Sequence, residues 1–323
     1  MTVPKEAGGL PAGARLRDIR TAGAAARHKE GMTLQMDDRQ TAKRVLAIHD
    51  LSGVGKCSLT AILPVLSAAG LECAALPTAV LSTHTGGFGE VVCQDLTDGM
   101  LPSARHWLRE GVGFDALYSG YLASREQLGI VREIFRMFRA GQEGGPLTLV
   151  DPVMGDNGRL YRLYTPEMAR EMAGLCACAD VIVPNLTEAA ILLGREYRPA
   201  VSREEAVELL HALSRLGPRR VVLTGVGFSA DRLGAACYDA DTGREGFAAE
   251  RTVPGHFYGT GDLFSSVLLA GLLHSKGLEA AMRAAVEFTA ESIRRTVDRG
   301  MEPRYGVCFE PGLPGLACRM ESE

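Results

Sequence analysis

The chain has 323 residues, of which 46% are hydrophobic, and it carries a net charge of −4 with a pI of about 6.0. This length suits one large α/β domain or two small ones, and the apolar content is sufficient for a substantial core. The charge is nearly balanced and no apolar run is long enough to span a bilayer, so neither a nucleic-acid nor a membrane partner is indicated.

The first 42 residues are rich in Ala, Gly, Arg and Asp and have no regular hydrophobic period. We expect this segment to be a disordered or weakly ordered N-terminal extension. It has no apolar core of the kind that a signal peptide needs, and the eight cysteines of the chain show no paired CxxC spacing. We therefore predict a cytoplasmic protein with reduced thiols, whose single folded domain spans residues 43–323.

The segment IHDLSGVGKCSLT (48–60) superficially resembles a phosphate-binding P-loop, because a Gly-Lys pair precedes a predicted helix. A P-loop needs a Gly that is separated from this pair by four residues, and Ser or Thr directly after the pair. Here the two positions hold Asp50 and Cys57. A carboxylate would repel phosphates and a thiol is a poor magnesium ligand, so the segment is not a P-loop.

Short apolar runs alternate with helical periods along the remaining chain. A helix is predicted over 58–70, and two more over 261–275 and 278–297 close the domain. A small β-hairpin is predicted in the C-terminal third, from residues 233–239 and 245–253 around the turn ADTG. The other predicted strands are 44–48, 73–81, 115–120, 147–151, 180–185 and 220–225. Repeated strand–helix units with continuously apolar strands predict an α/β fold, with a mostly parallel central sheet flanked by helices on both faces.

Polar residues follow these strands, at the edge where parallel α/β sheets bind their ligands. The sharpest motif at this edge is GTGD (259–262), directly before a predicted helix. Its glycines leave free backbone N–H groups at the helix N-terminus, which together form an anion site. Asp262 either acts on a group beside that anion or merely caps the helix, because Asp is favoured in first turns.

Five segments in this order resemble the ribokinase-like superfamily, and within it the vitamin B6 kinases that act on pyridoxal, pyridoxamine and pyridoxine. The segments are PTAVLSTHTGGFG (77–89), SGYLAS (119–124), DPVMGDNG (151–158), PNLTEAAIL (184–192) and GTGD (259–262). The resemblance covers residues 44–298. It implies a homodimeric kinase that uses ATP and Mg²⁺ to phosphorylate the 5′-hydroxymethyl group of a B6 vitamer, for salvage of pyridoxal 5′-phosphate. A requirement for a monovalent cation stays open.

The resemblance also implies roles for individual residues. Asp262 matches the catalytic base, which contacts the substrate hydroxymethyl and takes its proton. The anion hole around the transferring phosphoryl group matches Gly259, Thr260 and Gly261. Asp151 and Glu188 match the acidic positions near the nucleotide phosphates and the magnesium ion.

The remaining implied positions bind the nucleotide or the vitamin. On the nucleotide side these are Asn185, Thr224 and Gly225, and on the substrate side Asp50, Ser52, Thr85, Gly86 and Tyr121. Some bacterial members carry Lys where Thr224 aligns, so its nucleotide contact differs from theirs. Asp50 either accepts a hydrogen bond from the pyridine ring or caps the following turn, and the sequence favours neither.

The physical chemistry of phosphoryl transfer agrees with these roles. The reaction requires positioning and positive potential at the developing charge. No lysine lies between Lys56 and Lys276, so no lysine at a strand end can supply that potential. We expect the potential to come from backbone amides at residues 259–262 and from a divalent cation held by Asp151 and Glu188. Arginine is a further source, although no Arg lies inside the motifs themselves.

Two other functions compete with this one. The first is phosphorylation of another small alcohol, such as the hydroxymethylpyrimidine of thiamine synthesis, a sugar or a nucleoside. In the pyrimidine branch we expect Cys rather than Asp at the last position of GTGD, and sugar kinases carry lid strands that residues 50–90 lack. The second is a non-catalytic nucleotide- or vitamin-binding protein on the same fold, which would not need Asp262.

Overall fold

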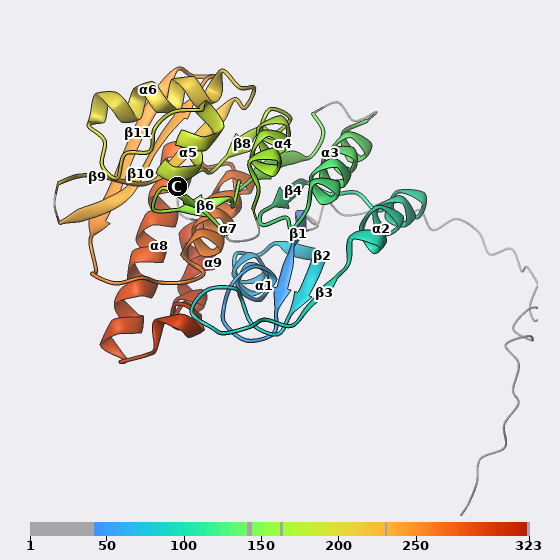
Figure 1. Cartoon of the computed structure of the whole chain (residues 1–323), viewed down its shortest axis with the longest axis horizontal. Coiled ribbons are helices and arrows are strands. Elements are labelled where there is room, and N and C mark those ends of the chain that lie inside the picture. The colour runs from blue at the N-terminus through green and yellow to red at the C-terminus, as the bar shows by residue number, and fades with distance from the viewer. Residues whose placement is uncertain (1–41, 141–143, 162–163, 230, 322–323) are drawn as a thin grey trace, which may run out of the picture. The chain divides into compact units, whose positions relative to one another are not determined.

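The computed structural model describes residues 42–140, 144–161, 164–229 and 231–321. The predicted N-terminal extension, apart from residue 42, lies outside this part of the chain. Within it, nine strands form one sheet in the order β11-β10-β9-β8-β5-β4-β1-β2-β3 (Figure 1). These strands are β1 (Arg44–Ser52), β2 (Glu72–Leu81), β3 (Cys93–Asp95), β4 (Ala116–Ser119), β5 (Leu147–Val150), β8 (Val181–Ile182), β9 (Arg220–Ser229), β10 (Arg232–Asp239) and β11 (Arg244–Arg251).

The six strands from β9 through β8, β5, β4 and β1 to β2 are parallel to their neighbours, whereas β3, β10 and β11 pair antiparallel at the two edges. The prediction of a mostly parallel sheet is confirmed. The predicted hairpin is also present, as β10 and β11. It is not a separate element, because β10 pairs with β9 and the hairpin thereby widens the main sheet.

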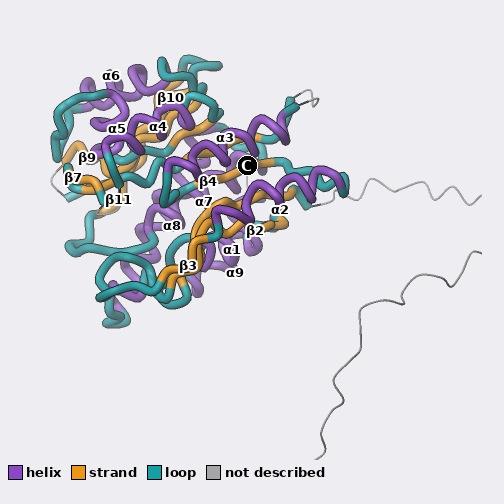
Figure 2. Tube along the Cα trace, turned by 45° about the vertical axis from the view of Figure 1, so that its right-hand side comes forward, coloured by secondary structure: helices purple, strands orange, loops and turns teal. Residues whose placement is uncertain are grey.

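Helices cover both faces of the sheet (Figures 1 and 2). Alternate residues of β1 enter different cores, with Val45 and Ala47 on one face and Leu46 and Ile48 on the other. The first core is shared with α1 (Leu59–Ala68), α7 (Thr260–Leu273), α8 (Leu278–Asp298) and α9 (Leu313–Glu321). The second is shared with α2 (Thr97–Arg109), α3 (Arg125–Arg139), α4 (Pro166–Cys176), α5 (Leu186–Leu193) and α6 (Arg203–Ser214).

Three features were not predicted from the sequence. Strand β1 runs to Ser52 instead of ending at residue 48, because a register shift between His49 and Leu51 lets it continue pairing with β2. The DPVMGDNG segment contains a two-stranded hairpin, β6 (Gly155–Asp156) with β7 (Arg159–Leu160). The chain also continues after α8 through two short 3-10 turns, Pro303–Tyr305 and Glu310–Gly312, into α9. In the described residues no helix is both long and apolar enough to cross a membrane.

Candidate active site

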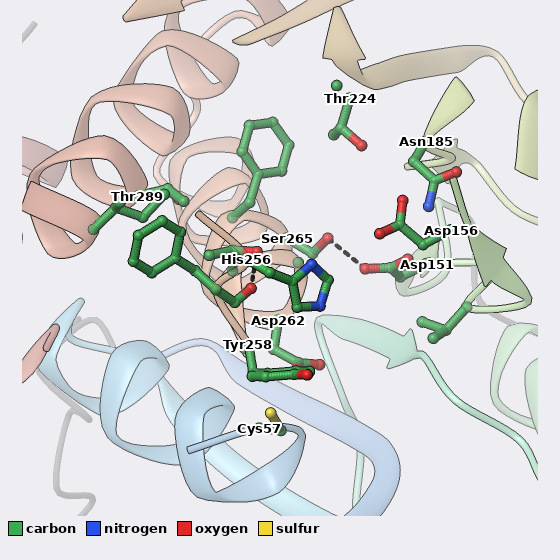
Figure 3. A pocket seen from close by; sticks show the side chains of 18 of the residues that line it. Cys57, Asp151, Asp156, Asn185, Thr224, His256, Tyr258, Asp262, Ser265 and Thr289 are labelled. Atoms are coloured by element: carbon green, nitrogen blue, oxygen red, sulfur yellow. Dashed lines mark hydrogen bonds between the residues drawn. The ribbon is translucent and has the colours of Figure 1, made fainter. Parts of the chain in front are cut away.

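A cavity of about 770 Å³ opens at the carboxyl ends of the parallel strands, next to the N-terminus of α7. It gathers residues from segments far apart in the chain (Figure 3). Of the residues predicted from the sequence, those lining it are Asp50, Thr85, Gly86, Tyr121, Asp151, Asn185, Glu188, Thr224, Gly225, Gly259, Thr260, Gly261 and Asp262. Ser52 is the exception: it is fully buried behind the cavity wall and donates a hydrogen bond to Asp50.

The N-terminus of α7 faces the cavity without a side-chain cap. Gly259 is the N-cap residue, and its φ of 76° lies in the left-handed region that favours glycine. A Cβ at this position would come 2.0 Å from the carbonyl oxygen of Lys56. Only glycine therefore fits, and the first backbone N–H groups of a 14-residue helix are left to bind an anion.

Asp262 lies in the first turn of this helix but does not cap it. Its Oδ2 accepts a hydrogen bond of 2.8 Å from the backbone N–H of Ser58, which precedes α1. Burial raises the pKa of Asp262 to about 7, although the Ser58 N–H opposes this, and the charges of Asp151 and Asp50 raise the pKa further. A carboxylate with a pKa near neutrality is a suitable general base.

Two further carboxylates, Asp151 and Glu188, line the cavity and are more buried than Asp262. Ser265, on the same helix as Asp262, donates a hydrogen bond of 2.9 Å to Asp151 Oδ2 (Figure 3). Burial raises the pKa of both carboxyl groups, and the charge of Asp151 raises that of Glu188 further. A bound cation would offset the cost of holding two buried negative charges close together.

The pair fits Mg²⁺ rather than a metal held by protein ligands alone. In the described part of the chain, no cluster of three or more His, Cys, Asp or Glu side chains is arranged to hold a metal. Mg²⁺ commonly binds one or two carboxylates and completes its shell with water and substrate phosphates. Asp151 and Glu188 can supply those carboxylates beside an anion site.

Asn185 and Glu188 also have a structural role. They form a capping box at the start of α5, in which the Asn185 side chain accepts from Glu188 N–H and Glu188 Oε2 accepts from Asn185 N–H, both at 2.9 Å. Glu188 Oε1 further accepts from Met154 N–H, and the Asn185 amide donates to the Gly155 carbonyl. The two residues therefore hold the hairpin β6–β7 against α5 while facing the cavity.

Residues of β9 and α8 form a further part of the cavity wall. Thr224 and Gly225 lie at the bend of β9, where Gly225 has a φ of 75°. On α8 the lining is mostly apolar, with Val286, Ala290 and Ile293 beside the polar Thr289. Such a wall suits the flat base of a nucleotide, at a distance from the carboxylates.

The rings of His84 and Tyr258 line the same cavity as Asp50. The rings of His84 and Tyr258 lie 4.8 Å apart, and a Cβ on Gly86 would collide with the Tyr258 ring. His84 accepts from Gly86 N–H through Nδ1, and its Nε2 lies 2.6 Å from the Arg304 carbonyl oxygen. These contacts hold the loop at residues 84–86 against Tyr258, which precedes α7, and against Arg304, which follows α8.

Sequence reasoning missed several residues of the cavity wall. Ser265 lies three residues after Asp262, so helical periodicity could have placed it on the same face. Asp156 lies in β6 and Tyr161 directly follows β7, in a hairpin that was not predicted from the sequence. Ser58 left no signal, because its contacts depend on a φ of 51° that Ser rarely adopts.

Comparison with known proteins agrees with this geometry. Residues 58–305 match the family model described as phosphomethylpyrimidine kinase. The chain belongs to this family. It is also 32% identical over 306 residues to pyridoxal kinase from Ovis aries, covering 86% of this chain and 92% of that relative.

Two solved structures are similar over most of the chain. A Bacteroides thetaiotaomicron protein assigned as a phosphomethylpyrimidine kinase and solved with pyridoxal has 38% identity and a TM-score of 0.81, with 85% of this chain and 96% of that chain covered. Pyridoxal kinase from Lactobacillus plantarum has 33% identity and a TM-score of 0.78, with coverage of 86% and 98%. The predicted resemblance to vitamin B6 kinases and the predicted fold are both confirmed.

Proposed function

We propose that this protein is a kinase that transfers the γ-phosphoryl group of ATP to the 5′-hydroxymethyl group of a B6 vitamer. The observation that carries this proposal is the position of Asp262. Its carboxylate, with a pKa raised to about 7, lies in the first turn of a helix whose free N–H groups face a cavity of small-molecule size. The pyridoxal kinase relatives and the pyridoxal-bound structure support the choice of acceptor.

Asp262 acts as the base in this reaction. Its Oδ2 is occupied by Ser58 N–H, so Oδ1 is the oxygen available to the substrate hydroxyl. As the hydroxyl oxygen forms its bond to the γ-phosphorus, Asp262 accepts the hydroxyl proton and the bond to the β-phosphate oxygen breaks, which releases ADP. The backbone N–H groups of Thr260, Gly261 and Asp262 bind the oxygens of the transferring group.

Asp151 and Glu188 would hold Mg²⁺ together with the phosphates of ATP. When bound, Mg²⁺ neutralises charge on the phosphate oxygens. Asn185, Thr224 and Gly225 line the path of the nucleotide, and the apolar residues of α8 face its base. Asp50, Thr85, Gly86 and Tyr121 surround the vitamin ring, with Asp50 accepting a hydrogen bond from the ring nitrogen or hydroxyl.

Phosphorylation of a hydroxymethylpyrimidine is the second candidate, because the matching family model and the Bacteroides thetaiotaomicron structure both carry the phosphomethylpyrimidine kinase name. Asp at position 262, where we expect Cys in the pyrimidine branch, favours the B6 vitamers. The family resemblance supports a homodimer and the unpaired cysteines support a cytoplasmic location; light scattering of the purified protein tests the dimer.

The deciding experiment measures Mg-ATP turnover on pyridoxal, pyridoxamine, pyridoxine and hydroxymethylpyrimidine. Asp262→Asn should lose about 10²–10⁴-fold in kcat, the usual effect of removing a general base. Asp98→Asn is the matched control, because Asp98 also lies in the first turn of a helix but is exposed. A pyrimidine preference would move the protein to the thiamine route, and ATP binding without turnover would indicate a binding protein.

A further inference from the structure

Ser58 contacts two carboxylates of the cavity at once. Its backbone N–H donates to Asp262 Oδ2 at 2.8 Å, and its hydroxyl donates to Asp50 Oδ1 at 2.6 Å. Asp262 lies on α7 and Asp50 on β1, so one residue at the start of α1 joins the two sides of the cavity. Nothing in the sequence motifs assigns a role to Ser58.

We propose that Ser58 is a positioning residue whose backbone amide orients the base Asp262 and whose hydroxyl fixes Asp50 for recognition of the vitamin ring. This inference rests on the proposed function, since it assumes that the acceptor ring lies against Asp50. Ser58 itself acts through the two carboxylates. Its amide contacts Asp262 and its hydroxyl contacts Asp50, so the two roles can be tested separately.

The amide arm is fixed by the backbone. Ser58 forms an isolated bridge with Leu51, and its carbonyl accepts hydrogen bonds from Ala61 N–H and Ile62 N–H at the start of α1. The direction of its own N–H is therefore set by the main chain and does not depend on its side chain. Any residue that keeps this backbone still orients Asp262, with Oδ1 left for the substrate hydroxyl.

The hydroxyl arm determines how Asp50 is presented. Asp50 is 4% exposed, and burial raises the pKa of its carboxyl group. The hydroxyls of Ser58 and Ser52 lower that pKa, with Ser58 at 2.6 Å and Ser52 at 3.1 Å. Together the two hydroxyls hold the Asp50 carboxylate in one orientation, in which it can accept a hydrogen bond, and Ser58 is the closer of the two donors.

The backbone of Ser58 supplies a control for this inference. Its φ of 51° is costly for any residue with a side chain, so Ala adds no strain that Ser lacks, whereas Gly relieves the strain. Ser58→Ala and Ser58→Gly both remove the hydroxyl and both keep the N–H. A kinetic effect common to both variants therefore reports the hydroxyl, and an effect of only one of them reports the backbone.

The test measures kcat, KM for pyridoxal and pyridoxine, and KM for ATP in wild type, Ser58→Ala, Ser58→Gly and Ser52→Ala. Both Ser58 variants should raise the vitamer KM about 10-fold or more, the usual effect of losing a hydrogen bond to a charged group. Their kcat should stay within about 3-fold of wild type, because the amide still holds Asp262. Ser52→Ala should raise the vitamer KM less, and the KM for ATP should not change.

A double-mutant cycle completes the test. In an Asp50→Asn background, Ser58→Ala should raise the vitamer KM by less than 3-fold or so, because the group through which Ser58 acts has lost its charge. An unchanged vitamer KM in both Ser58 variants of an active enzyme overturns this inference alone, as does full additivity with Asp50→Asn. A wild-type protein without vitamer turnover contradicts the proposed function and this role of Asp50 together.

Discussion

The hydroxyl of Ser265 on α7 donates a hydrogen bond to Asp151 Oδ2 at the end of β5, across 2.9 Å. Helix α7 therefore carries the base Asp262 in its first turn and Ser265 in the following turn. Ser265 is the hydrogen-bond partner of Asp151, the proposed metal ligand. The helix that provides the anion site thus also sets the distance between the two chemical halves of the cavity. Displacing α7 would therefore shift Asp262 and stretch the hydrogen bond between Ser265 and Asp151 at the same time.

Replacing Ser265 by Ala should weaken binding of Mg-ATP. Ser265 lowers the pKa of the buried Asp151 carboxyl, so its removal raises that pKa and leaves less charge for the cation. We expect the KM for Mg-ATP to rise about 10-fold, while the vitamer KM stays constant. Steady-state kinetics at varied ATP and saturating vitamer checks this.

Ser266→Ala is the control for that variant. Ser266 is equally buried, but its hydroxyl donates to the Asp262 carbonyl within the helix and not to Asp151. Equal effects of the two substitutions on the ATP KM would mean that the loss comes from repacking α7. A larger effect of Ser265→Ala on the ATP KM would mean that the loss comes from the missing hydrogen bond to Asp151.

The pH dependence of kcat/KM should report Asp262. Because its pKa is raised to about 7, the free enzyme holds this base protonated under mildly acidic conditions. We expect kcat/KM to rise about tenfold per pH unit below pH 7 and to level off above it. Profiles measured with pyridoxine and with pyridoxamine should share this limb, because it belongs to the enzyme. A limb that moves with the vitamer contradicts the assignment.

The outline of this site followed from the sequence because parallel strands deliver their polar ends to one edge. GTGD indicated a helix N-terminus and Asp151 was expected at a strand end, whereas the roles of Asp151 and Glu188 came from the resemblance of DPVMGDNG and PNLTEAAIL to the vitamin B6 kinases. Those arguments depend on local residue patterns. They could be made from one chain without knowledge of its packing.

The features that the sequence predicted wrongly or not at all depend on long-range contacts instead. Ser52 was expected to touch the substrate, but the extended β1 buries it behind Asp50, to which it donates. Ser58 reaches Asp262 only because α1 and α7 pack together and because its backbone adopts a φ of 51°. Helix α9 follows Pro- and Gly-rich turns, and its short apolar face is explained only by the core that it completes.

The charge of Asp262 should destabilise the fold at high pH. Its folded pKa of about 7 lies above the ordinary value of 3.8, so the protonated carboxyl is the form that the fold favours. The wild type therefore loses stability as the pH rises from about 4 to 7, by on the order of 1–4 kcal/mol. Asp262→Asn removes this loss, and its Tm should exceed that of wild type by several degrees at pH 8.5 but not at pH 4.

Thermal unfolding of wild type, Asp262→Asn and Asp98→Asn at pH 4, 6 and 8.5 measures this effect. The exposed Asp98 should leave the difference between pH 4 and 8.5 as in wild type. An Asp262→Asn protein that is less stable than wild type at pH 8.5 would show that the charged carboxylate, through its bond from Ser58 N–H, stabilises the fold. It would then not be a strained functional group.

The two glycines of the anion hole should respond differently to Ala. At Gly259 a Cβ would lie 2.0 Å from the Lys56 carbonyl oxygen, and the φ of 76° disfavours any side chain. At Gly261 the nearest atom to an added Cβ is Asp151 Oδ2 at 3.8 Å, an ordinary contact. We therefore expect Gly259→Ala to lower the Tm by several degrees, and Gly261→Ala to leave it nearly unchanged.

Their kinetics should separate as well. Gly259→Ala must displace either α7 or the loop around Lys56, so we expect it to lose at least ~100-fold in kcat as the backbone amides leave their positions. Gly261→Ala keeps the helix in place and adds a methyl group where the phosphoryl oxygens bind, so its loss should appear in kcat without a loss of Tm. If both variants unfold at the wild-type temperature and turn over alike, the N-terminus of α7 does not form the anion hole.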